Sequence, residues 1–404
     1  MEVCVKRVVP VGLAATLMIV AAASNCRGQD ATAAGKLPQK AVALEQAGKN
    51  AEAEAAWRAF LKIQPANPEA YAHLGLLEAR QERYREAVPL YRKALALNPA
   101  MPGLRMNLGL ALFKGGELKE AIQTFNPLLK NQPPSSPDAQ RLRTLIGMAH
   151  YGLEEYAAAI PDLKEAAASD PQNLAFRLVL AHSCLASKQF QCVLDVYHEI
   201  LMLNAESAEA DMLAGEASDE MNDRIGATEQ FRAAVKANPK EPNVHFGLGY
   251  LLWTQNQYEE ASQEFLAELA NVPNHVQAMT YLADVNLKTN HPEVALPLIE
   301  KAIRLDPEME LAHLDLGILH ADAGRRDAAL RELKVAAKLS PNDVNPHWRL
   351  ARLYQVMGRK EEANAEFQKT SSLTKAADDS VSSKLESARA KSKPTEAGAG
   401  PPGK

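Results

Sequence analysis

Cysteine is scarce in this chain, which holds four among 404 residues. Cys4 and Cys26 lie within or beside an apolar N-terminal stretch, so only Cys184 and Cys192 remain in the body of the chain. No histidine or second cysteine pair accompanies them at metal-ligand spacing, which argues against a zinc site, and we expect no metal or cofactor. The two cysteines flank a predicted turn and can form a disulfide if their β-carbons face each other. The favoured interpretation is a pair of reduced, partly buried thiols.

Strand-type sequence and an excess of one charge are also missing. Outside the N-terminus, no run of β-branched residues alternates as in a half-buried strand, so the predicted class is all-α. The formal net charge is −5, and acids and bases are interspersed along the chain. The charge pattern therefore gives no indication of a nucleic-acid surface.

Catalytic signatures are missing as well. The ten histidines are scattered, and no nucleophile or carboxylate recurs with them at an interpretable spacing. His73, His313 and His347 are therefore predicted to be partly exposed helix residues. Gly115-Gly116 lacks the preceding strand and the following Lys-Ser/Thr of a phosphate-binding loop. The sequence predicts neither an enzyme nor a catalytic residue.

What the sequence does contain is a repeated unit, best seen from Asn67 to Pro99. Its apolar residues follow helical spacing on two faces, a polar break at residues 81–83 separates them, and Pro99 closes the unit. This pattern predicts a helix, a short turn and an antiparallel second helix. Gly75 and Ala87 are small where the two helices must approach closely.

The unit recurs with a step of 34 residues over most of the chain. Positions equivalent to Gly75 hold Gly109, Gly147, Ala181, Gly215, Gly249, Ala283, Gly317 and Ala351. Positions equivalent to Ala87 hold Ala53, Ala121, Ala159, Val193, Ala227, Ala261, Ala295, Ala329 and Ala363. The step lengthens to 38 between Pro133 and Pro171, through a turn-forming insertion. Because both series keep one register, we count about ten repeats between residues 34 and 375.

This helix–turn–helix unit, with its small residues and closing proline, strongly resembles the tetratricopeptide repeat. The resemblance implies an α-solenoid in which helix pairs stack into a right-handed superhelix. The first repeat lacks the usual tyrosine, leucine and glycine of its first helix. The fifth repeat has Val193 and Ala205 at the small-alanine and proline positions. The first and second helices of each repeat are called helix A and helix B below.

The N-terminal segment gives an expectation about location. Residues 1–30 are predicted to be a signal peptide or N-terminal anchor, because Lys6 and Arg7 precede an uncharged apolar run over residues 8–23. Cleavage after this run, an uncleaved anchor and a lipoprotein signal at Cys26 remain open. In each case we expect an exported protein, periplasmic or associated with the cell envelope, and the last two options attach its N-terminus to a membrane.

The C-terminal segment is expected to close the solenoid. Asp379 or Ser380 is predicted to cap a last helix over residues 376–390. Such a helix would cover the apolar flank of the final repeat, and disorder is the alternative. Residues 391–404 contain no core-forming residue and are predicted to be disordered.

The resemblance implies that helix A lines a concave wall, the usual ligand surface of this family. In repeats three to five the wall residues are apolar: Met106, Leu110, Phe113, Leu145, Met148, Tyr151, Leu178, Val179 and Leu185. In repeats six to eight they are acidic and aromatic: Glu209, Glu216, Asp219, Glu220, Phe246, Tyr250, Trp253, Tyr281 and Asp284. Packing between repeats is the alternative explanation of the apolar set. Acids beside aromatics are typical of a recognition groove.

The predicted ligand is an extended or helical peptide, apolar at one end and basic toward the other. The clamp that some family members use for a C-terminal carboxylate is absent, since only Asn107 and Arg141 fall at suitable positions. The function hypothesis is a non-catalytic protein–protein interaction scaffold or adaptor at the cell envelope, with no nucleic-acid partner. The alternative is a substrate-recognition or accessory subunit of an envelope enzyme or assembly machine.

Overall fold

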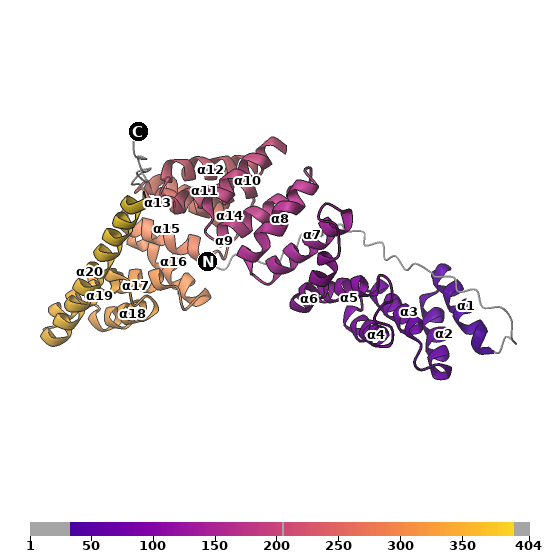
Figure 1. Cartoon of the computed structure of the whole chain (residues 1–404). Helices are drawn as coiled ribbons and strands as arrows, with labels where there is room; N and C mark the ends of the chain where they lie inside the picture. The colour runs from indigo at the N-terminus through magenta and orange to yellow at the C-terminus, as the bar shows by residue number, and fades with distance from the viewer. Residues whose placement is uncertain (1–32, 204–205, 392–404) are drawn as a thin grey trace, which may run out of the picture. The chain divides into compact units, whose positions relative to one another are not determined.

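The computed structural model describes residues 33–203 and 206–391, with side chains over 36–203 and 206–379. Within these ranges the chain forms 20 helices and no strand (Figure 1), which confirms the predicted all-α fold. The predicted leader, and all but the first residue of the predicted disordered tail, lie outside the described residues.

The helices form ten consecutive A–B pairs, as the repeat count predicted. Their bounds are α1 Ala33–Gln46, α2 Asn50–Ile63, α3 Pro68–Arg80, α4 Tyr84–Leu97, α5 Leu104–Lys114, α6 Leu118–Lys130, α7 Pro137–Gly152, α8 Tyr156–Ser169, α9 Leu174–Ala186, α10 Phe190–Leu203, α11 Ala208–Glu220, α12 Arg224–Ala237, α13 Val244–Thr254, α14 Tyr258–Asn271, α15 Val276–Lys288, α16 Pro292–Leu305, α17 Glu310–Asp322, α18 Arg326–Leu339, α19 Val344–Val356 and α20 Lys360–Lys391.

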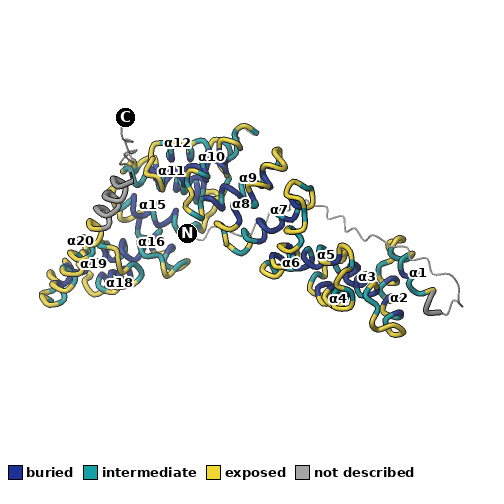
Figure 2. The backbone as a smooth tube through the Cα atoms, viewed as in Figure 1, coloured by how far each residue is buried: buried dark blue, intermediate teal, exposed yellow. Residues whose placement is uncertain are grey.

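The chain divides within α12, between Gln230 and Phe231, into two compact units that are described separately. In the first unit each helix from α1 to α11 packs against the next, and in the second unit α13 to α20 do the same. Contacts also join successive A helices, such as α3 with α5 and α13 with α15. Buried positions lie where helices face one another, and exposed positions gather at the turns (Figure 2). Each unit therefore buries its apolar residues in successive clusters, most of which are shared by neighbouring repeats.

Helix A approaches helix B closely at the predicted small residues. A β-carbon added at Gly75 would lie 2.7 Å from the ring of Tyr91, and one added at Gly109 would lie 2.3 Å from the ring of Phe125. Ala87 is completely buried. A side chain of helix B, a ring in these two repeats and Leu333 opposite Gly317, therefore rests on the backbone of helix A, which explains why a small residue recurs at this position.

The first repeat, which lacks the usual glycine, is held by contacts around Glu45 of α1. Trp57 Nε1 donates to Glu45 Oε1 at 2.5 Å, and His73 Nδ1 lies 3.1 Å from Glu45 Oε2. The Trp57 and His73 rings are stacked with centroids 4.5 Å apart. These contacts join α1, α2 and α3, so helix A of the first repeat forms despite its atypical sequence.

Two histidines are more buried than the sequence analysis expected. His313 and His347, predicted to be partly exposed, are only 7% and 8% exposed. His313 Nδ1 lies 2.8 Å from Glu332 Oε2, and its Nε2 lies 3.0 Å from the carbonyl oxygen of Pro307. His347 makes the equivalent pair of contacts in the last repeat. The prediction was wrong because each ring fits between helix B and the preceding turn, where its polar atoms have partners.

Cys184 and Cys192 form a disulfide, so the favoured interpretation of two reduced thiols is wrong. Their Cα atoms are 5.8 Å apart, because the short turn between α9 and α10 brings the last turn of one helix beside the first turn of the next. The bond joins helix A to helix B in the fifth repeat, where Val193 replaces the usual small alanine.

The last helix also differs from the prediction. α20 runs without a break from Lys360 to Lys391, so Asp379 and Ser380 lie inside it and do not begin a separate helix. The reason is that no proline or glycine interrupts residues 360–391, and nothing ends helix B after its usual length. That this segment covers the final repeat stays a prediction.

Candidate functional site

The apolar residues predicted for the wall of repeats three to five pack largely against the core. Met106, Leu110 and Phe113 of α5 are partly buried against the core shared by α3 to α7. Leu145 belongs to this core and is only 4% exposed, so it offers no surface to a ligand. A similar partly buried set on α7 and α9 packs on the next core: Met148, Tyr151, Leu178, Val179 and Leu185. Packing between repeats therefore accounts for much of this set.

The four acids Glu209, Glu216, Asp219 and Glu220, called the α11 acids below, all lie on α11 in the first unit. Glu209 and Glu220 are exposed, whereas Glu216 and Asp219 are partly buried. Burial raises the pKa of Glu216, and the negative charge of Glu220 raises it further. Like charges therefore act on one another along this helix.

In the second unit the predicted aromatic residues converge. Phe246, Tyr250 and Trp253 of α13 and Tyr281 of α15 form what is called the ring surface below. The ring centroids are 6.0 Å apart for Tyr250 and Trp253, 5.5 Å for Tyr250 and Tyr281, and 5.0 Å for Trp253 and Tyr281. Phe246 joins the group 5.9 Å from Tyr281. All four side chains are partly buried, so each keeps some exposed surface.

A polar cluster closes one edge of the ring surface. Trp253 Nε1 donates a hydrogen bond of 2.5 Å to Asp284 Oδ2. Lys288 Nζ pairs with the same oxygen and lies 4.9 Å from the centroid of the Trp253 ring. Asp284 was predicted as a wall acid, and the structure brings it to the rings but leaves it only 5% exposed. Lys288 was not predicted, although its position four residues after Asp284 was a usable signal.

A second carboxyl group, that of Asp315 on α17, lies near this cluster. Asp315 is 2% exposed, and its Oδ2 has no hydrogen-bond partner among the described residues. Burial raises the pKa of Asp315 well above its ordinary value, the charge of Asp284 raises it further, and Lys288 and Arg349 oppose this. The cluster thus contains two buried carboxyl groups that act on each other electrostatically.

The last helix A carries an aromatic and basic patch that the sequence analysis missed. Trp348 on α19 is 40% exposed. The guanidinium carbons of Arg349 and Arg352 lie 5.2 Å and 5.6 Å from its ring centroid. The signal in the sequence was a tryptophan followed by arginines one and four residues later. Because this patch is basic, a cationic peptide is not expected to bind it.

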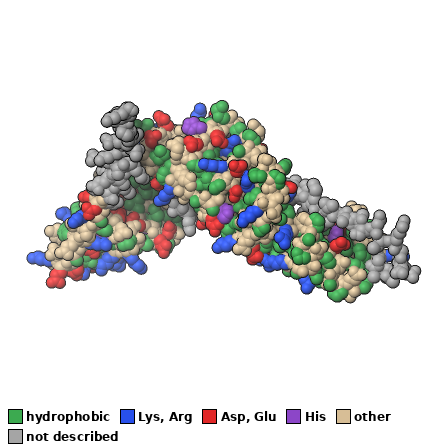
Figure 3. Space-filling model, viewed as in Figure 1, with side chains coloured by type: hydrophobic (Ala, Val, Ile, Leu, Met, Phe, Trp, Pro, Cys, Tyr) green, Lys and Arg blue, Asp and Glu red, His purple; other side chains and the backbone are tan. Residues whose placement is uncertain are grey.

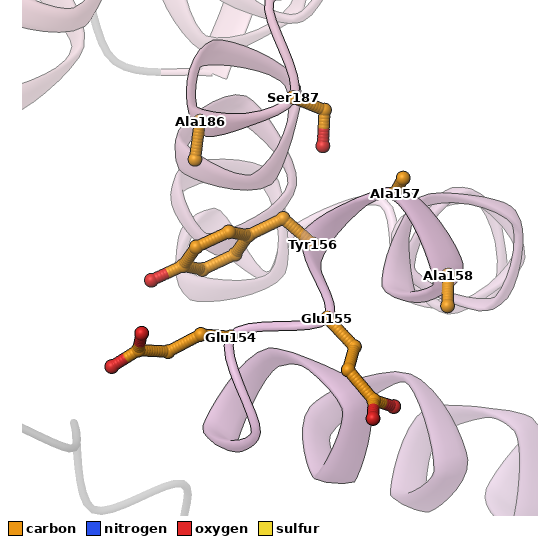
Figure 4. Close-up of a pocket in the computed structure, with 7 residues that line it drawn as sticks. All are labelled: Glu154, Glu155, Tyr156, Ala157, Ala158, Ala186 and Ser187. Atoms are coloured by element: carbon orange, nitrogen blue, oxygen red, sulfur yellow. The ribbon is translucent and has the colours of Figure 1, made fainter.

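A shallow pocket in the first unit lies at the turn between α7 and α8, beside the end of α9 (Figure 4). Its lining residues are Glu154, Glu155, Tyr156, Ala157, Ala158, Ala186 and Ser187. The two carboxylates point away from each other and from the hydroxyl of Ser187. Glu155 Oε2 lies 2.7 Å from His150 Nδ1, which accounts for that acid. The pocket therefore holds no converging acid, base and nucleophile.

Other site classes find no support in the described part of the chain. No group of three or more metal-ligating side chains occurs within residues 33–203 and 206–391. No helix in those ranges combines the length and the apolar character needed to cross a membrane. On the face shown in Figure 3, acidic and basic side chains are interspersed in both units. This mixed distribution of charge does not indicate a nucleic-acid partner.

The helix pairs, each with a small-residue contact between helix A and helix B, stack one on the next. This arrangement defines the chain as an α-solenoid scaffold, a class of protein that mediates protein–protein interactions. The chain belongs to the tetratricopeptide repeat family. One family model of this description matches residues 39–102, 144–191, 214–276 and 280–344, and another matches residues 78–146. Members of this family are generally non-catalytic scaffolds with protein partners.

Two curated proteins show a distant similarity. The chain is 21% identical over 238 residues to anaphase-promoting complex subunit 3 of Schizosaccharomyces pombe, covering 56% of this chain and 36% of that protein. It is 26% identical over 153 residues to the protein CTR9 homolog of Arabidopsis thaliana, covering 37% of this chain and 14% of that protein. The chain therefore spans well under two thirds of the length of these relatives.

Solved structures with a similar fold include yeast Tom70 and the APC/C hetero-tetramer Cut9-Hcn1. The Tom70 match has 16% identity and a TM-score of 0.39, and it covers 84% of this chain and 85% of that chain. The Cut9-Hcn1 match has 11% identity and a TM-score of 0.44, and it covers 85% of this chain and 88% of that chain. At these identities and TM-scores, nothing about the function of this chain follows from either match.

Proposed function

We propose that this chain is a non-catalytic scaffold that binds a peptide segment of a partner protein on the ring surface of α13 and α15. The observation that carries the proposal is the group of four partly exposed rings with Asp284 at its edge. A cationic side chain beside these rings gains attraction to their π faces, worth ~0.5–2 kcal/mol. Asp284 supplies the opposite charge. The ligand is therefore a peptide that carries at least one basic residue.

Two of the four rings, those of Tyr250 and Trp253, make no ring contact with helix B among the described residues. The buried side of α13 is formed by Leu248, Leu251 and Leu252, each no more than 2% exposed. At Gly249 an added β-carbon would lie 2.7 Å from the ring of Phe265 on α14, so the usual close contact is also present. The rings of Phe246 and Tyr281 also contact that of Phe265, with centroids 6.1 Å and 5.9 Å apart. The rings of Tyr250 and Trp253 contact other rings of α13 and α15. Large aromatic side chains at a partly exposed surface favour a role in binding.

The first unit also has acidic and apolar residues on its A helices that could contact a peptide. The α11 acids carry like charges, and basic residues of a peptide would relieve their mutual repulsion. The partly buried apolar residues of α5 and α7 offer exposed edges to apolar side chains. Taken by itself, the first unit therefore also suits a peptide that is apolar at one end and basic toward the other.

Trp253→Ala is expected to weaken peptide binding about tenfold at low and at high salt, because it removes a ring whose contact energy does not depend on charge alone. A peptide array read at two salt concentrations measures this. Trp348→Ala is the matched control, since it removes the tryptophan of the basic patch in the same unit. Preferential capture of acidic peptides, or equal binding by Trp253→Ala and the parent, would show that the ring surface is not the site.

We also propose that the scaffold acts at the cell envelope, because basic residues and an apolar run precede the repeats. The intact mass of the native protein is expected to lack the leader or to include a lipid on Cys26. A mass that includes the whole leader would favour the uncleaved anchor. Recovery of all the protein as a full-length chain from the cytosol would contradict export.

A further inference from the structure

Lys288 makes, within the chain, the two contacts that the proposed cationic ligand would make. Its Nζ pairs with Asp284 Oδ2 and lies 4.9 Å from the centroid of the Trp253 ring. The side chain of Lys288 is 37% exposed, whereas that of Asp284 is 7% exposed. Lys288 is also the last residue of α15. The carboxylate is thus held in place, and the lysine is the partner that can turn out into solvent.

The buried carboxyl groups of this cluster favour replacement of the Lys288 ammonium by another cation over its departure without a replacement. On α17, Asp315 is 2% exposed, and its Oδ2 has no partner among the described residues. The charged groups that act on Asp315 are Asp284, Lys288, Glu310 and Arg349. Lys288 is the cation paired with Asp284, so its loss without a replacement would leave a buried carboxylate without its partner.

We infer that Lys288 is a built-in competitor for the basic side chain of the peptide. It covers Asp284 and Trp253 in the unliganded chain, and an arginine of the ligand displaces it. This inference rests on the proposed function of the ring surface. Arginine can displace lysine because its planar guanidinium stacks on an indole ring, binds a carboxylate through two N–H groups and is more weakly hydrated than an ammonium. A peptide lysine would only exchange one ammonium for another, so the site prefers arginine.

Competition of this kind lowers the apparent affinity for the peptide. The apparent affinity equals the affinity of the uncovered site multiplied by the fraction of time for which the site is uncovered. If Lys288 covers the site about nine-tenths of the time, the affinity falls about tenfold. An ion pair between two exposed side chains would be too weak for this. The Lys288 pair is stronger, because its carboxylate is buried and its ammonium also lies over an indole ring.

Lys288→Met tests the inference, because methionine keeps an unbranched apolar side chain and removes the charge. Fluorescence anisotropy would measure two labelled peptides, a leucine segment followed by two arginines and the same segment followed by two lysines. The parent is expected to bind the arginine peptide more tightly, and Lys288→Met is expected to bind both about tenfold more tightly than the parent. Lys288→Arg should bind both more weakly, because a resident guanidinium competes better.

Lys338→Met is the matched control, since Lys338 is an exposed lysine of α18 and its removal changes the net charge equally. If Lys288→Met raises the affinity for the peptides no more than Lys338→Met does, the inference is wrong. The proposed function still stands in that case, provided that the parent binds and Trp253→Ala binds more weakly. Lys288→Arg binding as tightly as the parent would also contradict the inference. If neither peptide binds the parent or any variant, the proposed function itself fails.

Discussion

Replacing Glu268 by alanine is expected to lower the free energy of unfolding by about 2–4 kcal/mol. Glu268 lies on α14 and is completely buried. Its Oε1 accepts the backbone N–H of Asn243 at 3.1 Å, and its Oε2 accepts that of Phe246 at 3.2 Å. A carboxylate of one helix therefore caps the N-terminus of α13, where the helix dipole also favours negative charge.

The substitution would leave two partly buried backbone N–H groups without their acceptors. It would also disturb the neighbouring contact, in which His275 Nε2 donates to Asn243 Oδ1 at 2.8 Å. Burial lowers the pKa of His275, which keeps the ring neutral, so its Nδ1 can accept the N–H of Ala278. Together these contacts join α13, α14 and α15, the helices that hold the ring surface.

Urea unfolding followed by circular dichroism and tryptophan fluorescence measures the effect. Gln263→Ala, at an exposed position of the same helix, is the control and should change the free energy of unfolding by less than about 0.5 kcal/mol. Glu268→Gln keeps one acceptor oxygen, so its effect on the free energy of unfolding is expected to lie between those of Glu268→Ala and Gln263→Ala. If Glu268→Ala cost no more than the control, the carboxylate would not be the cap of α13.

The fold was predictable because the chain repeats one pattern of residues many times. The small residues recur every 34 residues with one 38-residue step, and they mark contacts such as that of Gly109 with Phe125. The sequence analysis failed where the environment of a residue depends on distant partners. The ring of His313 contacts Glu332, 19 residues later, and Pro307, six residues earlier. Helical periodicity gives the face on which a residue lies, but not what packs against that face.

The candidate site was predictable only in part, for the same reason. Periodicity placed Trp253, Tyr281 and Asp284 on helix A, and the structure brings these three side chains together. The sequence analysis treated acidic residues as exposed and therefore did not predict that Asp284 and Asp315 are buried. The burial of a charged residue depends on how neighbouring repeats pack, which a single helix pattern does not encode. That the ring surface binds a peptide stays a prediction.

Glu310, the first residue of α17, is expected to make the protein less stable as the pH rises. Burial, and then the charge of Asp343, raise the pKa of Glu310 to about 7 from the ordinary value of 4.5, whereas His313 lowers it. Its Oε1 is buried and has no hydrogen-bond partner among the described residues. Because its pKa is higher in the folded chain than in the unfolded chain, the folded chain binds more protons between pH 4.5 and 7. The stability therefore falls across this window.

Glu310→Gln should consequently stabilise the protein by about 1–3 kcal/mol at pH 8 and change its stability little near pH 4.5. Glutamine is neutral at both pH values, so at high pH it removes the cost of a buried charge, and at low pH it replaces a group that is already protonated. Urea unfolding at the two pH values measures the difference. Glu308→Gln, at an exposed position two residues earlier, should have the same small effect at both. An equal gain from Glu310→Gln at both pH values would mean that the Glu310 carboxyl group does not titrate in this window.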